Sequence, residues 1–283
     1  MKQLVVTADD FGMSVEVNEA VEAAHRDGIL TSASLVVTGN AVDDAIRRAR
    51  RLPTLGVGLH LALFGARAAA GASRLAPDGV NLGETPVRTG IALMLFPRTR
   101  AQLAREIAAQ AEAFRTTGLG CTHLDGHWHC HQHPAVLPLA LEAVRPLGAR
   151  AVRIPYETAG FSRQAAGRGA LARTAQSLAH APLAAMMRHT ARRHGFATND
   201  HFFGKVDAGV ISLPLLLGMA AALTHGVTEL GLHPALAGFA GSGPHAPPAH
   251  WQQAAELAAL TDPALRAALA ARDVRLCRWD EIA

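Results

Sequence analysis

Residues Leu4-Val5-Val6-Thr7-Ala8-Asp9-Asp10-Phe11-Gly12 decide the fold of this chain, because a short apolar run ends there in two adjacent carboxylates. Residues 4–6 are apolar and too few for a helix, so they predict a buried strand. The acids then follow the carboxyl end of that strand, where α/β proteins place their active sites. Asp is also a common helix N-cap, and an amphipathic helix is expected from residue 15. One cap needs one acid, so the pair favours a functional site.

Composition is typical of one large cytoplasmic domain. The 283 residues, with 49% hydrophobic side chains, can bury a sizeable core and fit a single domain over residues 1–283. Three scattered cysteines are too few for a disulfide framework. We expect no signal peptide, and the apolar stretch 211–223 falls short of the ~20 residues that span a bilayer. The pI near 9.5 suggests an anionic partner, and nucleic acid is not expected.

Strand-like and helix-like segments alternate along the whole chain. After the first unit, strands are expected at residues 32–37, 56–61, 121–124, 151–154, 198–203, 228–233 and 274–277. Repeated βα units without an internal sequence repeat imply a parallel sheet, open or closed. We therefore predict an α/β fold, a distorted or incomplete (β/α) barrel of seven or eight mostly parallel strands.

Two segments are longer than a simple βα connection requires. Residues 64–97 are rich in Gly, Ala and Pro, which predicts a lid-like loop. Residues 158–199 hold six arginines and no acidic residue, which predicts a basic, largely helical insertion with a helix over 170–194 interrupted near Pro182. This insertion is either a solvated helical surface or a face for an anionic membrane.

Polar side chains follow several of the expected strands. Asp9, Asp10, His60, His127 and His233 each lie at or just beyond the carboxyl end of one. In a (β/α) barrel these ends converge on one rim, however far apart they lie in the sequence. The sequence therefore predicts one site that contains all five.

A histidine cluster follows the strand expected at residues 121–124. Five histidines fall within residues 123–133, next to Asp125, although the chain holds 15 histidines and a fortuitous tract is the alternative. In an extended segment, His127, His129 and His131 would share one side. Imidazole with carboxylate suits zinc and related divalent ions. Because one ion cannot bind them all, some must orient other ligands or contact substrate.

Several motifs together resemble the YdjC-like carbohydrate deacetylases. They occur in the family's order, cover nearly the whole chain, and include Thr7-Ala8-Asp9-Asp10-Phe11-Gly12, Gly58-Leu59-His60-Leu61, His123-Leu124-Asp125-Gly126-His127 and Gly231-Leu232-His233-Pro234. Residues 151–157 and 198–204 resemble more narrowly the hopanoid-biosynthesis-associated branch, HpnK. The chain departs from the family pattern at two neighbouring positions. Gly126 stands where many relatives carry serine, and Trp128 replaces a common histidine.

The resemblance implies metal-dependent removal of the N-acetyl group of an amino sugar. By motif, Asp10, His60 and His127 would bind one divalent ion, zinc or magnesium, with Asp9 as general base and His233 as general acid. The narrower resemblance implies an N-acetylglucosaminyl hopanoid as substrate, with glucosaminyl hopanoid and acetate as products. Residues expected to orient ligands or contact substrate are Asp125, Trp128, His129, His131, Arg153 and Tyr156.

Other functions remain open on the sequence. Soluble chito-oligosaccharides are the competing substrate. A metal-dependent phosphoesterase could use the same Asp and His residues, usually with two metals ~3.5–4 Å apart. A metal-binding or lipid-carrier protein is the non-catalytic alternative, although it would not need Asp9. Peripheral contact with an anionic inner membrane and a homodimer are also left open.

Overall fold

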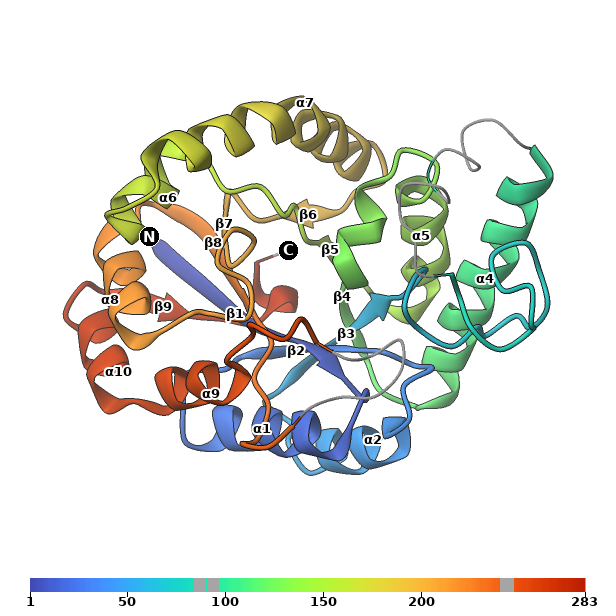
Figure 1. Cartoon of the computed structure of the whole chain (residues 1–283), viewed down its shortest axis with the longest axis horizontal. Helices are drawn as coiled ribbons and strands as arrows, with labels where there is room; N and C mark the ends of the chain where they lie inside the picture. The colour runs from blue at the N-terminus through green and yellow to red at the C-terminus, as the bar shows by residue number, and fades with distance from the viewer. Residues whose placement is uncertain (84–89, 91–96, 240–246, 283) are drawn as a thin grey trace.

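The computed structural model describes residues 1–83, 90, 97–239 and 247–282. Its strands are short, and helices pack around them (Figure 1). The strands are β1 (Lys2–Phe11), β2 (Ser32–Leu35), β3 (Gly56–Leu61), β4 (Cys121–Gly126), β5 (Ala151–Val152), β6 (Ala197–Thr198), β7 (His201–Phe203), β8 (Gly226–Leu232) and β9 (Val274–Leu276). The α-helices are α1 (Val15–Arg26), α2 (Val42–Arg50), α4 (Pro97–Thr116), α5 (Leu137–Val144), α6 (Ala159–Ala166), α7 (Ala170–Arg193), α8 (Leu213–Ala222), α9 (Gln253–Thr261) and α10 (Pro263–Ala270).

The strands form one parallel sheet that curls into an open barrel. Eight of them follow the order β6-β5-β4-β3-β2-β1-β8-β7, and β9 pairs with the start of β1. The barrel stays open between β6 and β7, although these strands are neighbours in sequence. There the Asn199 side chain accepts from Ile154 N and donates to the carbonyls of Ile154 and His201. The predicted incomplete (β/α) barrel is confirmed, but residues 198–203 belong to both edges of the sheet rather than to one strand.

The central strand β1 is longer than the sequence predicts. It continues through both aspartates to Phe11, and its pairing with β2 shifts register between Ala8 and Phe11. Asp10 lies in this bulge with φ 64°, a left-handed conformation that Asp tolerates better than most residues. In a regular strand, adjacent side chains point to opposite faces. The bulge re-aims this pair, which explains how both carboxylates reach the same site.

The helix after β1 does not use either aspartate as its cap. The Ser14 hydroxyl accepts from Val17 N at the start of α1. Asp9 and Asp10 are therefore free of this structural role, as the pairing of two acids suggested.

The basic insertion contains helices α6 and α7, and the helix expected over residues 170–194 is not interrupted near Pro182. Helix α7 continues through Pro182, which lies on the exposed side where the unpaired carbonyl can face water. In the other long segment, residues 84–89 and 91–96 lie outside the described residues, so its role as a lid stays a prediction. Among the described helices, none is long and apolar enough to cross a membrane.

Candidate active site

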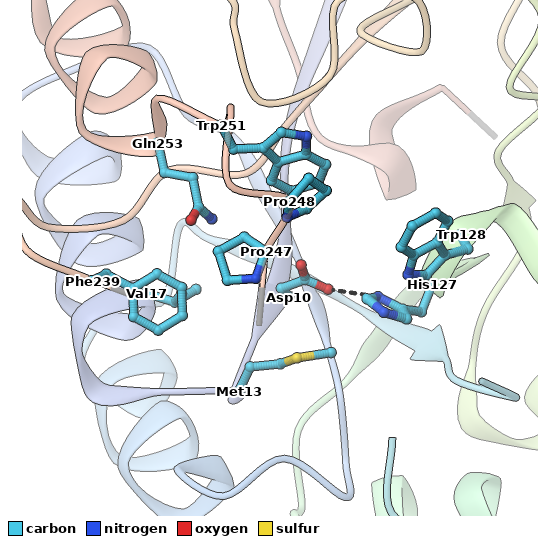
Figure 2. Close-up of a pocket in the computed structure, with 10 residues that line it drawn as sticks. All are labelled: Asp10, Met13, Val17, His127, Trp128, Phe239, Pro247, Pro248, Trp251 and Gln253. Atoms are coloured by element: carbon cyan, nitrogen blue, oxygen red, sulfur yellow. Dashed lines mark hydrogen bonds and ion pairs between the residues drawn. The ribbon is translucent and has the colours of Figure 1, made fainter. Parts of the chain in front are cut away.

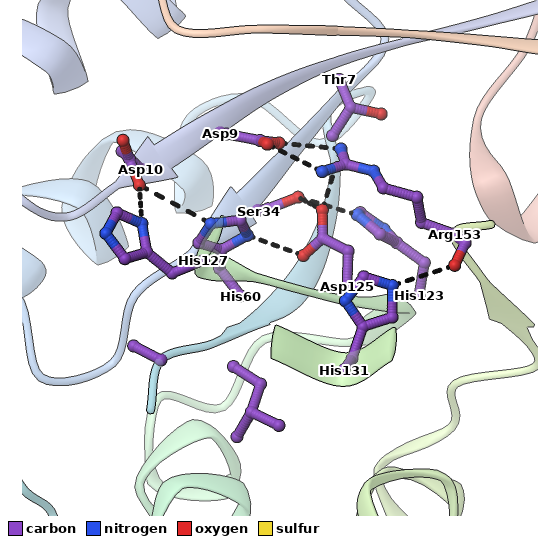
Figure 3. A network of polar contacts seen from close by, with 12 residues as sticks. Thr7, Asp9, Asp10, Ser34, His60, His123, Asp125, His127, His131 and Arg153 are labelled. Atoms are coloured by element: carbon purple, nitrogen blue, oxygen red, sulfur yellow. Dashed lines mark hydrogen bonds and ion pairs between the residues drawn. The ribbon is translucent and has the colours of Figure 1, made fainter. Parts of the chain in front are cut away.

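Asp10, His60 and His127 come together at the carboxyl ends of β1, β3 and β4. One ligand atom from each lies within 4.8 Å of the others. His127 Nδ1 donates to Asp10 Oδ1 at 2.9 Å, and His60 Nε2 lies 3.6 Å from the same oxygen (Figure 3). One carboxylate oxygen and two imidazole nitrogens form a donor set that suits zinc or a related divalent ion. The structure thus brings together the three residues predicted to bind metal.

The electrostatics of this group favour a cation. Burial alone would lower the pKa of His60, but the Asp125, Asp9 and Asp10 carboxylates raise it to about 9. Burial alone would raise the pKa of Asp10, but the His127, His233 and His60 imidazoles hold it below its usual range. The raised pKa of His60 indicates negative surroundings that stabilise a positive charge, and the lowered pKa of Asp10 keeps its carboxylate ionised. The residues present therefore fit a bound divalent ion.

Asp125 orients His60 from behind. Its Oδ1 accepts from His60 Nδ1 at 2.8 Å, which leaves His60 Nε2 directed toward Asp10. Its Oδ2 accepts from the Ser34 hydroxyl at 2.6 Å, and Ser34 in turn lies 3.0 Å from His123 Nε2. All four side chains are buried. A carboxylate that fixes the ring and tautomer of a ligating histidine is a common feature of metal sites.

We expect Asp125→Asn to weaken metal binding by ~10–100-fold, because an amide polarises and orients His60 less well. Dissociation constants from metal titration of the folded protein would measure the loss. Asp207→Asn is the matched control, because Asp207 is also a buried aspartate but pairs with Arg173 on α7. An equal loss of metal affinity in both variants would contradict this role for Asp125.

Arg153 occupies the centre of a second acidic group. Its guanidinium donates to both oxygens of Asp9 at 2.7 and 2.8 Å and also pairs with Asp125 (Figure 3). It pairs with Glu229 as well. Asp9, His60 and Asp125 also have ligand atoms within 4.8 Å of one another. The guanidinium already supplies the cation for those two carboxylates, so of the two groups Asp10, His60 and His127 could better hold a metal ion. Arg153 is fully buried and holds carboxylates in place, which corresponds to the first of the two roles expected for it, orienting other residues or contacting substrate.

The histidine segment is not extended, contrary to the sequence prediction. It forms a 3₁₀ helix, η1 (His127–Gln132), in which Trp128 and His129 have left-handed φ values of 51° and 54°. His127 reaches Asp10, whereas His129 packs edge-on against Phe202 and His131 Nε2 bonds the Arg153 carbonyl. The prediction that these three histidines share one side is wrong, because the left-handed turn breaks the alternation of a strand.

His233 follows β8. In the order of the strands, β8 lies on one side of β1, which carries Asp9, and β5, which precedes Arg153, lies on the other. His233 Nε2 lies 3.8 Å from Asp9 Oδ2, and its ring centroid lies 4.4 Å from that of Trp251. Its backbone N–H donates to the buried Glu256 carboxylate at 2.7 Å, and Ile211 N donates to the other oxygen of Glu256. Burial lowers the pKa of His233, which favours its neutral form. These contacts fix His233 beside Asp9.

A partly apolar pocket opens beside Asp10 and His127 (Figure 2). Trp128 stands at its edge with 66% of its surface exposed. The remaining lining residues are Met13, Val17, Phe239, Pro247, Pro248, Trp251 and Gln253. None of this lining comes from the described parts of residues 64–97 or 158–199. Tyr156 is also absent from the lining, and its hydroxyl lies 3.2 Å from Ser177 Oγ.

Sequence reasoning missed several residues that support the site. They are Ser34, Glu229, Trp251 and Glu256. Glu229 could have been found, because an acid inside an otherwise apolar buried strand needs a charged partner. Ser34, Trp251 and Glu256 give no such signal, since Ser, Trp and Glu are common in strands, loops and helices without a function.

Several known proteins are similar to this chain. Residues 3–271 match the family described as YdjC-like protein. The mouse protein named carbohydrate deacetylase is 36% identical over 99% of this chain and 94% of its own length. A Salmonella paratyphi B protein named chitooligosaccharide deacetylase is 35% identical over 55% of this chain and 60% of its own length.

The fold also has a solved counterpart. A putative cellobiose-phosphate cleavage protein from Enterococcus faecalis superposes with a TM-score of 0.72 and 22% identity, covering 100% of this chain and 99% of that one. At this identity the likeness concerns the fold alone. The family match spans most of the chain and includes every residue of the Asp10, His60 and His127 group. The chain therefore belongs to the YdjC-like protein family.

Proposed function

We propose that this protein is a metal-dependent carbohydrate deacetylase that removes the N-acetyl group of an amino sugar. The observation that carries the proposal is the convergence of Asp10, His60 and His127 beside a second aspartate, Asp9, which is held apart by Arg153. Full-length relatives named carbohydrate deacetylase support the reaction class.

Amide hydrolysis needs a nucleophilic water, stabilisation of a developing oxyanion, and a proton for the departing amine. A divalent ion held by Asp10, His60 and His127 would supply positive charge for the acetyl oxygen. Asp9 is placed to accept the proton of the attacking water, because each of its oxygens keeps a lone pair after bonding Arg153. His233 Nε2 lies 3.8 Å from Asp9 Oδ2, so His233, neutral at rest, is placed to take up that proton and pass it to the leaving amine, which would otherwise be a very poor leaving group.

One metal fits this site better than two. The Asp9 and Asp125 carboxylates already share the Arg153 guanidinium, so they are poor candidates for a second ion. A phosphoesterase of the two-metal type would need that second position. This arrangement favours the deacetylase over the phosphoesterase.

We further propose that the amino sugar is carried by a lipid, as in an N-acetylglucosaminyl hopanoid. The apolar lining beside Asp10, with Met13, Val17 and Phe239, supports a substrate with an apolar portion next to the sugar. The exposed Trp128 offers a flat surface for a sugar ring or the lipid. A soluble chito-oligosaccharide is the second candidate, favoured by the relative named chitooligosaccharide deacetylase.

Acetate release from both substrates separates these alternatives. Purified protein, loaded with zinc or magnesium, is offered the glycosylated hopanoid in detergent and chitobiose in solution. We expect faster acetate release from the lipid-linked sugar. Efficient turnover of chitobiose with no turnover of the lipid would contradict the lipid-linked substrate, and no acetate release from either would contradict the deacetylase.

A further inference from the structure

The outward face of helix α7 is apolar. Leu171 and Leu178, seven residues apart, expose 89% and 70% of their surface. This spacing returns to the same side of a helix after two turns, so the two leucines form one ridge. Exposed apolar residues continue the ridge along the helix, namely Ala175, Pro182 and Ala185. A surface helix normally carries polar side chains on this side.

Polar residues of the same helix face inward instead. Arg173 is buried and donates to both oxygens of Asp207 at 2.8 and 2.7 Å. Ser177 is buried and its hydroxyl accepts from Ala159 N. The helix thus buries these two polar side chains and exposes its two leucines. Large exposed apolar side chains on one ridge mark a surface for a partner.

Basic residues flank the ridge at both ends. Arg163 and Arg168 are exposed and line a hollow next to the first residue of α7, while Arg192 and Arg193 are exposed in its last turn. Arg168 lies 3.8 Å from Asp207 but keeps 71% of its side chain exposed. The other two arginines of residues 158–199 bind protein groups more closely, Arg173 as above and Arg188 the carbonyls of Asn199 and Asp200. No acidic residue occurs in residues 158–199.

We infer that the α7 ridge docks on an anionic lipid bilayer. Apolar side chains flanked by arginines combine burial in the lipid interface with attraction to anionic headgroups. A second copy of this chain fits the ridge less well, because any α7–α7 pairing would place the arginines of one copy near those of the other. The inference rests on the proposed lipid-linked substrate, but vesicles that contain no substrate test it separately.

The position of the ridge on the barrel would let a docked bilayer lie near the proposed active site. The chain leaves the carboxyl end of β5, passes through α6 and α7, and returns to the beginning of β6. Both leucines fall in the first half of α7, and α7 arches over the edge of the sheet near β6 and β7 (Figure 1). The bilayer-facing leucines thus belong to the part of α7 nearer the rim that carries Asp10 and His127.

Vesicle flotation of the full-length protein tests this inference. The probes are vesicles of phosphatidylcholine alone and of phosphatidylcholine with about one third phosphatidylglycerol, at low and high salt. We expect binding to the anionic vesicles only, weakened by salt. The double variant Leu171→Gln/Leu178→Gln should bind about tenfold or more weakly, because the apolar part of the contact is lost. Val80→Gln is the matched control, since Val80 is an exposed apolar residue without neighbouring α7 arginines.

Any of three results would overturn the inference. The first is binding to anionic vesicles that the double variant retains in full, and the second is no binding at all. The third is a dimer in solution that the double variant converts to a monomer, which would make a second copy the occupant. Thermal unfolding of each variant shows whether it is folded, and the single variant Leu178→Gln provides a milder change should the double variant fail to fold. Failure of vesicle binding together with normal acetate release would leave the deacetylase proposal intact.

Discussion

Replacing His127 by alanine is expected to abolish both metal binding and acetate release, whereas Asp9→Asn is expected to abolish acetate release alone. His127 contributes an imidazole to the proposed ligand group, and its Nδ1 contacts Asp10. Asp9 lies outside that group, with both oxygens held by Arg153. Loss of a positioned general base typically reduces the rate by ~10²–10⁴-fold. Metal content per chain and acetate release, measured on the same preparations, would separate the two effects.

The asparagine variant is a close match in shape to the wild type. Its side-chain oxygen can still accept a hydrogen bond from Arg153. We therefore expect a small change in the midpoint of unfolding and a large loss of acetate release. If Asp9→Asn removes the metal as thoroughly as His127→Ala does, Asp9 is a ligand and the assignment of the base is wrong.

Arg153→Met is expected to lower the free energy of unfolding by at least ~3–5 kcal/mol, because it leaves buried carboxylates without their cation. Asp9, Asp125 and Glu229 all pair with this guanidinium, and all are buried. Burial already raises the pKa of Glu229 to about 7, even with Arg153 beside it. Chemical denaturation of the purified variant would measure the loss.

Arg188→Met provides the matched control for this substitution. Arg188 is partly buried but donates to neutral oxygens, the carbonyls of Asn199 and Asp200. We expect a loss of about 1–3 kcal/mol there. Adding Asp9→Asn to Arg153→Met should recover part of the larger loss by removing one charge. A similar loss in the two single variants would show that packing, rather than the three carboxylates, explains the role of Arg153.

The convergence of the site could be predicted from the sequence because parallel strands deliver their carboxyl ends to one rim. Asp10 lies near the end of β1, His60 lies near the end of β3, and His127 follows β4, and each is predicted from its place at or just beyond the end of a strand-like segment. Strand order was not needed for this prediction. Any closed or nearly closed arrangement of the same strands would place these three residues on one rim, and the observed order β4-β3-β2-β1 brings them close together on it.

Local backbone conformation could not be predicted in the same way. The bulge at Asp10 and the left-handed pair Trp128 and His129 depend on tertiary contacts that override the local preference for an extended chain. Hydrogen-bond partners from distant elements could not be predicted either. One example is Glu256 on α9, which accepts a hydrogen bond from the backbone N–H of His233. The interruption predicted near Pro182 is wrong for a related reason. Packing of α7 on both sides of the proline keeps the helix continuous.

The central claim is that Asp10, His60 and His127 hold one divalent ion that deacetylation requires. Elemental analysis of metal per chain, combined with acetate release before and after chelation, tests it most directly. We predict one zinc or magnesium ion per chain, loss of acetate release when that ion is removed, and recovery when it is restored. Full acetate release by metal-free protein, or two ions per chain in the active protein, would contradict the claim.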